Sequence, residues 1–156
     1  MVLPTIVRPL TAAQWTAARS LVSGYAASLG VSLDFQNFAT ELAHLSEVYA
    51  PPAGVFLLAR LEDDWIGCGG LRRITAERCE MKRLYVVPAA QGHGVGRALA
   101  ISLIADARRA GYSSMVLDTL PSMSHAQALY ESLGFVEIEP YRFNPVEGTR
   151  FLKLDL

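Results

Sequence analysis

Hydrophobic residues recur along this chain with two different periods, and the switch between them separates expected helices from expected strands. A row at helical spacing near the N-terminus consists of Trp15, Ala18, Val22, Tyr25 and Leu29. Thr11 and Gln14 precede it with the spacing of a capping box, and Gly30 follows it as a helix stop. The pattern therefore predicts a first helix between Thr11 and Gly30.

The helical period recurs three more times, and extended segments fill the intervals. A second helix is predicted from about residue 34 to the pair Pro51-Pro52, a third over 95–110, and a fourth around 126–133. Short apolar runs bounded by turn residues predict strands. The expected strands are 5–8, 55–61, 65–73, 79–87, 115–117, 135–138 and 150–154.

The order of these elements predicts the fold class. Antiparallel hairpins stand at the front of the chain, and strand, helix, strand, helix and strand follow in the middle. We expect an α/β (α+β) fold whose mixed, mostly antiparallel central sheet has helices on both faces. The 156 residues, 51% hydrophobic and 19% charged, suit one globular domain over 1–156.

Composition removes several classes of function. Lysine plus arginine number 14 and aspartate plus glutamate 15, so the net charge of -1 gives no sign of a nucleic-acid partner. Cys68 and Cys79 lack metal-ligand spacing and are expected in the core. No apolar run is long enough to span a membrane, and residues 1–4 do not begin a signal peptide. We expect a cytoplasmic protein with no metal and no membrane attachment.

The segment from Gln91 to Arg97 contains the most specific chemical signal in the chain. It joins a strand to a helix and contains three glycines at alternate positions. Glycine lets the backbone approach a ligand closely, and the free N–H groups of a helix start attract phosphate. The sequence of a P-loop is absent, and Arg97 stands where a dinucleotide fingerprint needs a third glycine. The segment therefore predicts a pyrophosphate site of another kind.

Gln91, Gly94 and Gly96 match the pattern [QR]xxGx[GA]. On this pattern the segment resembles motif A of the GNAT superfamily of acyl-CoA-dependent N-acetyltransferases. The resemblance extends to residues 80–86, which look like the family's fourth strand, and to residues 126–135, which look like its AxxLYxxxGF helix. It covers most of residues 78–138 in the family's order. It implies the GNAT fold and acetyl-CoA as co-substrate.

The resemblance also implies which residues contact the coenzyme. The end of the strand before the loop would pair with the pantetheine arm through its backbone, and the N–H of Val86 would bind the acetyl oxygen. The loop and helix start would hold the pyrophosphate. The implied coenzyme-binding residues are Leu84, Tyr85, Val86, Gln91, Gly92, His93, Gly94, Val95, Gly96 and Arg97.

Two catalytic residues are implied in the same way. A glutamate at the position of Glu80 is the general base in the histone-acetyltransferase branch, although a surface glutamate paired with Lys82 or Arg72 is the alternative. The tyrosine of AxxLY, here Tyr130, donates a proton to the CoA sulfur in many members, although Tyr130 also fits the apolar row of its helix. Met123 departs from the family, because many relatives have a pantetheine-binding asparagine at this place.

The implied reaction is transfer of an acetyl group from acetyl-CoA to a primary amine by direct attack. A small-molecule acceptor is favoured over a peptide. Basic side chains such as Arg142 are expected either to attract an acceptor that carries a carboxylate or to lie on solvated strand faces. Two alternatives stay open, a non-catalytic acyl-CoA-binding module and an enzyme that acetylates a protein N-terminus or lysine. A homodimer is one expected form of the protein.

Overall fold

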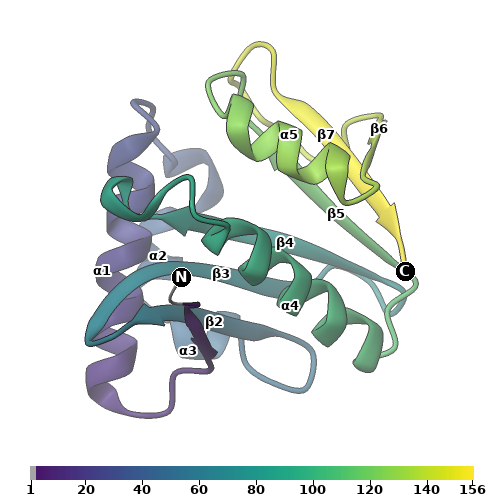
Figure 1. The fold of residues 1–156 in the computed structure, drawn as a ribbon. Coiled ribbons are helices and arrows are strands. Elements are labelled where there is room, and N and C mark those ends of the chain that lie inside the picture. Colours follow the sequence, from purple (N-terminus) through teal and green to yellow (C-terminus); the bar gives the residue numbers. More distant parts are fainter. Residues whose placement is uncertain (1–2) are drawn as a thin grey trace.

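One seven-stranded sheet organises the computed structural model, which describes residues 3–156. Met1 and Val2, part of the segment considered for a signal peptide, lie outside the described residues. The order of the strands is β1-β2-β3-β4-β5-β7-β6 (Figure 1). The strands are β1 (Thr5–Val7), β2 (Val55–Leu61), β3 (Asp64–Arg73), β4 (Arg78–Val86), β5 (Ser114–Thr119), β6 (Val136–Ile138) and β7 (Arg150–Asp155).

The pairing confirms the predicted fold class. Neighbouring strands run antiparallel, except that β4 and β5 run parallel. The parallel pair is the crossover through helix α4 (Val95–Arg109), as a strand-helix-strand connection requires. The sheet is therefore mixed and mostly antiparallel.

Helices cover both faces of the sheet (Figure 1). Helix α1 (Ala12–Ser28) packs on one face in a cluster that contains Val22, Phe56 and Leu58. Helix α4 packs on the other face in a larger cluster, and α5 (Ser124–Ser132) contributes Tyr130 to it. Phe56 and Leu58 of β2 belong to the first cluster, and the alternate residue Leu57 belongs to the second. Alternate side chains of β2 thus point to opposite faces, as in any strand that is buried on both sides.

The predicted start of the first helix is confirmed in detail. Thr11 Oγ1 accepts a hydrogen bond from the N–H of Gln14 at 3.1 Å, and Gln14 Oε1 accepts one from the N–H of Thr11 at 3.1 Å. This reciprocal pair is the capping box expected from the spacing. Cys68 and Cys79 are fully buried free thiols, as predicted.

The single second helix predicted between residue 34 and Pro51 is wrong. The segment contains the short helices η1 (Asp34–Gln36), α2 (Phe38–Ala43) and α3 (Leu45–Val48). Asn37 takes a left-handed conformation with φ of 54°, and His44 leaves the helical region with φ of -129°. Both residues interrupt the helical hydrogen-bond series, and the breaks turn Glu41 toward the sheet.

Within residues 3–156, no helix is both long and apolar enough to cross a membrane.

Candidate functional site

The backbone of β4 is irregular at the point where the site forms. Cys68 of β3 pairs with Tyr85 and Gly70 pairs with Lys82, so that Arg83 and Leu84 together face Gly69. This is a β-bulge, and Arg83 has a φ of 61° in it. A bulge bends a strand and redirects its side chains. Positive φ is unfavourable for a long side chain and is maintained by the contacts that Arg83 makes.

Beyond this region, β4 and β5 separate. Their parallel pairing covers three residue pairs, ending at Glu80 and Val116, although β4 continues to Val86 and β5 to Thr119. Figure 1 shows the two strands diverging from this point. The N–H and C=O groups of Leu84 to Val86 that face β5 therefore have no partner in that strand. Unpaired main-chain groups along a sheet opening are well suited to bind an extended amide chain.

The glycine loop begins where β4 ends. A short helix η2 (Pro88–Ala90) follows the strand, and the Gln91 side chain donates a hydrogen bond back to the C=O of Val86 at 3.0 Å. Gly92 and Gly94 both have φ of 82°, and a Cβ at either would meet nothing within 4 Å. Glycine is needed here for its backbone conformation, and the space beside it is open.

Gly94 is also the N-cap of α4, and no side chain caps this helix. The first N–H groups of a fifteen-residue helix are therefore free, and the helix dipole makes them electropositive. A pyrophosphate fits a helix start of this kind.

Other predicted loop residues have separate surroundings. The Val95 side chain is buried in the core. The Arg97 guanidinium is exposed and donates to Ser132 Oγ at 2.9 Å. His93 is exposed and lines a pocket with Trp65 and Val87 beside the loop. Gly96 has ordinary backbone angles, and a Cβ there would lie 3.7 Å from Val86.

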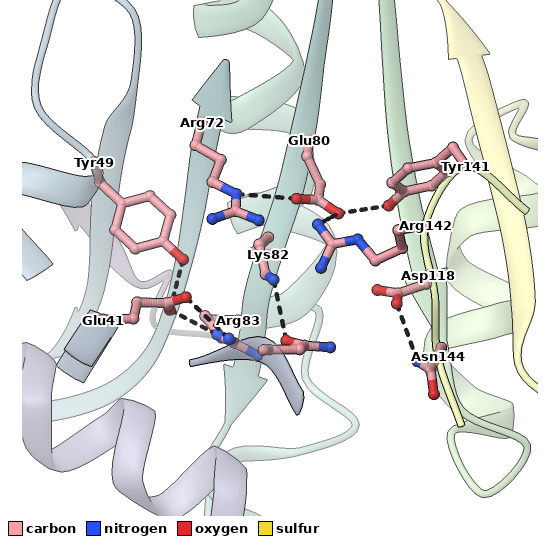
Figure 2. A network of polar contacts seen from close by, with 11 residues as sticks. Glu41, Tyr49, Arg72, Glu80, Lys82, Arg83, Asp118, Tyr141, Arg142 and Asn144 are labelled. Atoms are coloured by element: carbon pink, nitrogen blue, oxygen red, sulfur yellow. Dashed lines mark hydrogen bonds and ion pairs between the residues drawn. The ribbon is translucent and has the colours of Figure 1, made fainter. Parts of the chain in front are cut away.

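Glu80 lies at the last residue pair before β4 and β5 separate, and its side chain is fully buried. Its Oε1 accepts a hydrogen bond from Arg72 Nε at 3.0 Å, and its Oε2 accepts one from the Tyr141 hydroxyl at 2.6 Å and another from Arg142 (Figure 2). The alternative of a surface glutamate is wrong, although the pairing with Arg72 is confirmed. Burial beside this carboxylate raises the pKa of the Tyr141 hydroxyl.

A second buried ion pair supports the bulge. Arg83 donates two hydrogen bonds to Glu41 of α2, at 2.8 and 3.0 Å, and Tyr49 donates a third to Glu41 at 2.9 Å. Gly70 makes room for this contact, because a Cβ there would lie 2.5 Å from the Tyr49 ring. Burial alone raises the pKa of Glu41, but the hydrogen bond and charge of Arg83 outweigh it and hold that pKa below its ordinary value.

A cavity lies along β4 between these two ion pairs and β5. Lys82 enters it from β4 and Asp118 from β5, and Figure 2 shows both pointing into the same space. Lys82 Nζ donates to Gln36 Oε1 at 3.1 Å, and Asp118 Oδ2 accepts from the Asn144 amide at 3.1 Å. The cavity is lined by Tyr25, Gln36, Met81, Lys82, Arg83, Leu84, Asp118, Met123 and Tyr130.

Tyr130 and Met123 thus both face the opening where the family places the pantetheine arm. Tyr130 is buried, packs against Phe135 with ring centroids 5.6 Å apart, and also lines the cavity. Burial raises its pKa, so the hydroxyl is a hydrogen-bond donor rather than a strong acid. The two interpretations of Tyr130, as a core residue and as a site residue, are compatible with this position.

One further polar atom near the opening has no partner. Among the described residues, Thr119 Oγ1 at the end of β5 is the buried side-chain oxygen or nitrogen that forms no hydrogen bond. A buried hydroxyl without a partner is costly and is rare in proteins. Its place at the end of β5 suits a ligand that enters between β4 and β5.

Sequence reasoning missed Gln36, Glu41, Asp118 and Tyr141. Glu41 and Gln36 belong to the segment expected as one continuous helix, so no prediction turned them toward β4. Asp118 follows the strand expected over 115–117 and had only its polarity amid apolar residues as a signal. Tyr141 precedes Arg142, which was considered for the acceptor site, but no contact was predicted for Tyr141.

Comparison with known proteins gives one family. Residues 21–135 match the model of the Acetyltransferase (GNAT) family. An uncharacterised N-acetyltransferase of Schizosaccharomyces pombe is 40% identical over 140 residues, which cover 88% of this chain and 86% of the relative. The uncharacterised N-acetyltransferase YjgM of Escherichia coli is 29% identical over 86% of this chain and 83% of its own length.

Solved structures show the same fold. A GNAT-family acetyltransferase from Staphylococcus aureus has a TM-score of 0.81 at 19% identity, over 98% of this chain and 99% of that one. Salmonella typhimurium YncA, solved with acetyl-CoA, has a TM-score of 0.70 at 22% identity, over 98% of this chain and 94% of that one. The family match spans well over half of the chain and includes β4, the glycine loop and Tyr130, and on that evidence the chain belongs to the GNAT family of acetyltransferases.

Proposed function

We propose that this protein transfers the acetyl group of acetyl-CoA to a primary amine by direct attack of the amine on the thioester. The observation that carries the proposal is the uncapped start of α4 beside the opening between β4 and β5. The first suits a pyrophosphate and the second an extended acyl-pantetheine chain. Acetyl-CoA is bound in YncA, which has the same fold.

Residues of three elements would hold the coenzyme. The N–H groups of the loop and of the first turn of α4, from Gln91 to Arg97, would bind its phosphates. The backbone of Leu84, Tyr85 and Val86 would pair with the pantetheine amides, and the Val86 N–H would donate to the acetyl oxygen. Thr119 Oγ1 offers a further donor to a chain in the opening.

The chemistry then needs a neutral amine and a stabilised leaving group. The amine nitrogen forms a bond to the acetyl carbon, the carbon–sulfur bond breaks, and the sulfur leaves as the thiolate of CoA. The nitrogen gives up one proton, for which Glu80 is the candidate acceptor implied by the family. The Tyr130 hydroxyl would donate a hydrogen bond to the departing sulfur.

Acetyl-CoA is expected to raise the thermal midpoint by several degrees, whereas ATP and NADH at the same concentration should leave it unchanged. A ligand present at 100 times its Kd stabilises the folded state by about 2.7 kcal/mol. Gly94→Ala should reduce the shift, because a Cβ strains φ of 82° beside the phosphates. Gly111→Ala is the matched control, since Gly111 has φ of 91° and equal space but lies beyond the other end of α4.

Two results would separate the remaining alternatives. No shift with millimolar acetyl-CoA would overturn the coenzyme site. A normal shift, combined with no release of free CoA thiol across a broad panel of amines, would favour a non-catalytic acyl-CoA-binding module.

Tyr130→Phe is expected to lower kcat by about 10- to 100-fold with little change in stability, since it removes a hydrogen bond to a charged group and nothing from the core packing. Single-turnover measurement of CoA release, with a thermal midpoint for each protein, tests this. Tyr112→Phe is a suitable control, because the Tyr112 hydroxyl donates to the C=O of Ala53 at 2.6 Å, away from the cavity. A wild-type rate in Tyr130→Phe would remove Tyr130 from the reaction.

A further inference from the structure

Not every charged side chain around the cavity forms an ion pair with another. Arg72 and Arg142 both donate to Glu80, and Arg83 donates to Glu41. Lys82 is different, because its one hydrogen-bond partner among residues 3–156 is the neutral amide of Gln36. It is only 6% exposed and projects into the cavity. A cation that is buried and not paired with a carboxylate is costly unless a ligand supplies the charge.

The pKa of Lys82 reflects the cost of burying its charge. Burial, followed by the charge of Arg83, lowers the pKa of Lys82 to about 7, although Glu80 acts in the opposite direction. Arg72 and Arg142 lower it further. The groups that face Lys82 from β3, β4 and the segment before β7 are therefore mainly cationic. An anion placed beside Lys82 would offset the positive charge of these neighbours and favour the protonated lysine.

Asp118 presents the complementary feature across the cavity. Its carboxylate lies on β5, is partly buried, and accepts a hydrogen bond from the Asn144 amide. No cation pairs with it among the described residues. One cavity thus holds a cation on β4 and a carboxylate on β5, each held by a neutral amide (Figure 2). Such a pair complements a small molecule that carries both an anion and an ammonium group.

We propose that the acceptor is an amine that also carries a carboxylate, of the amino-acid class, whose carboxylate binds Lys82 and whose nitrogen lies against Asp118. This inference rests on the proposed function and specifies its acceptor. Asp118 lies on β5 beyond Val116, where β4 and β5 have already separated, so a nitrogen held there lies at the opening proposed for the thioester. Arg72 and Arg142 are then not the carboxylate ligands, because Glu80 already uses both.

The test compares each common L-amino acid with its own carboxamide, and 4-aminobutyrate with butylamine. The ratio of kcat/KM for acid over amide is measured in the wild type, in Lys82→Met and in Arg73→Met. A charge-assisted contact is worth about 10- to 100-fold, so the wild type should prefer at least one acid by this factor and Lys82→Met should lose the preference. Arg73→Met should keep it, because Arg73 is exposed and packs on Tyr112 outside the cavity.

The pH dependence gives a second signature. Lys82 must be protonated to bind a carboxylate, so the wild-type advantage over Lys82→Met for a preferred acid should fall as the pH rises above about 7. Ionisation of the acceptor amine cancels in this ratio, since both proteins receive the same acceptor. Lys82→Arg, which stays charged, should show no such fall.

Stability offers a readout without turnover. The pKa of Lys82 is lowered from 10.5 on folding, so its burial destabilises the protein most below about pH 7 and no longer does so above 10.5. Lys82→Met should therefore have a raised thermal midpoint at pH 6 and a smaller gain at pH 9. A more stable variant with poorer use of acids is the signature of a residue kept for its ligand.

The failures are distinguishable. Equal use of acids and amides by the wild type, or a preference that survives in Lys82→Met, would overturn the inference and leave the proposed function intact. If no amine is acetylated, the proposed function fails, and the inference is judged by thermal shifts of the CoA-saturated protein with the acid and amide of each pair. Equal shifts would overturn it, and shifts with acids that require Lys82 would support it.

Discussion

Replacing Glu41 by alanine is expected to lower the free energy of unfolding by about 3–5 kcal/mol, because it leaves a buried guanidinium without its carboxylate. The side chain of Arg83 is 2% exposed and that of Glu41 is 5% exposed, so water cannot take the place of the lost partner. The loss is a large part of the about 5–15 kcal/mol that stabilises a domain of ordinary size. Urea denaturation, with the midpoint and slope fitted separately, measures it.

Two control variants separate the charge effect from other losses. Tyr49→Phe removes one neutral donor to Glu41 and should cost about 1 kcal/mol. The double variant Glu41→Leu with Arg83→Met removes both charges, and should recover most of the stability lost in Glu41→Ala. A loss below about 1 kcal/mol in Glu41→Ala would be typical of an exposed pair, and would contradict the burial argument.

The acid side of the stability curve tests the same pair. Because Arg83 holds the pKa of Glu41 below its ordinary 4.5 in the folded state, the unfolded chain binds a proton first as the pH falls. The contribution of Glu41 is therefore complete above pH 4.5 and is lost as the pH falls through the lower folded value. Glu41→Ala should lack this part of the acid dependence.

The ion pair also supports the backbone of β4 at the proposed site. Arg83 has a φ of 61° in the bulge, which costs of order 1–3 kcal/mol and needs contacts that maintain it. Arg83 also packs over the rings of Phe38 and Tyr25, 5.2 and 5.7 Å from their centroids. The bulge includes Leu84, the first of the main-chain groups proposed to hold the pantetheine arm. Glu41, which touches no substrate in this scheme, would thus act as a positioning residue.

Local signals predicted those parts of the fold that depend on local interactions. The capping box of α1 and the glycines of the loop were predictable because each involves residues a few positions apart. The sheet class was predictable because the order of strands and helices limits the topologies. The separation of β4 from β5 was not predicted from the residues, since no residue type in β4 requires it.

The segment from Asp34 to Val48 shows where local reasoning stops. Its apolar residues have helical spacing, and neither glycine nor proline marks the breaks. Asparagine tolerates the left-handed conformation that Asn37 takes, but an asparagine in a sequence does not by itself predict it. The breaks follow from a tertiary contact, because Glu41 has to face Arg83, which is 42 positions away. The helical pattern was correct for each piece and wrong for the whole.

Replacing Glu80 by glutamine is expected to lower kcat by about 100- to 10,000-fold with nearly unchanged affinity for acetyl-CoA, as removal of a general base does. Tyr141→Phe and Arg72→Met are the comparison variants, because each keeps the carboxylate and removes one donor from it. A general base accepts the proton on a carboxylate oxygen. Each comparison variant keeps that carboxylate and removes one hydrogen bond from it, so neither should reproduce the loss of kcat. Steady-state kinetics across pH, with acetyl-CoA affinity by thermal shift, measures these effects.

The opposite outcome has an equally definite structural meaning. Both oxygens of Glu80 already accept hydrogen bonds, and two of the three donors come from residues 61 and 62 positions later in the chain. If Glu80 only anchors that segment, Glu80→Gln and Tyr141→Phe should both raise the KM of the acceptor and lower the thermal midpoint, and the pH profile of kcat should keep its shape. The base would then have to be sought among the groups facing the opening, where Asp118 carries a carboxylate that no cation in the described chain pairs with. The division of the loss between kcat and KM therefore decides whether Glu80 accepts the proton or anchors the segment that contains Tyr141 and Arg142.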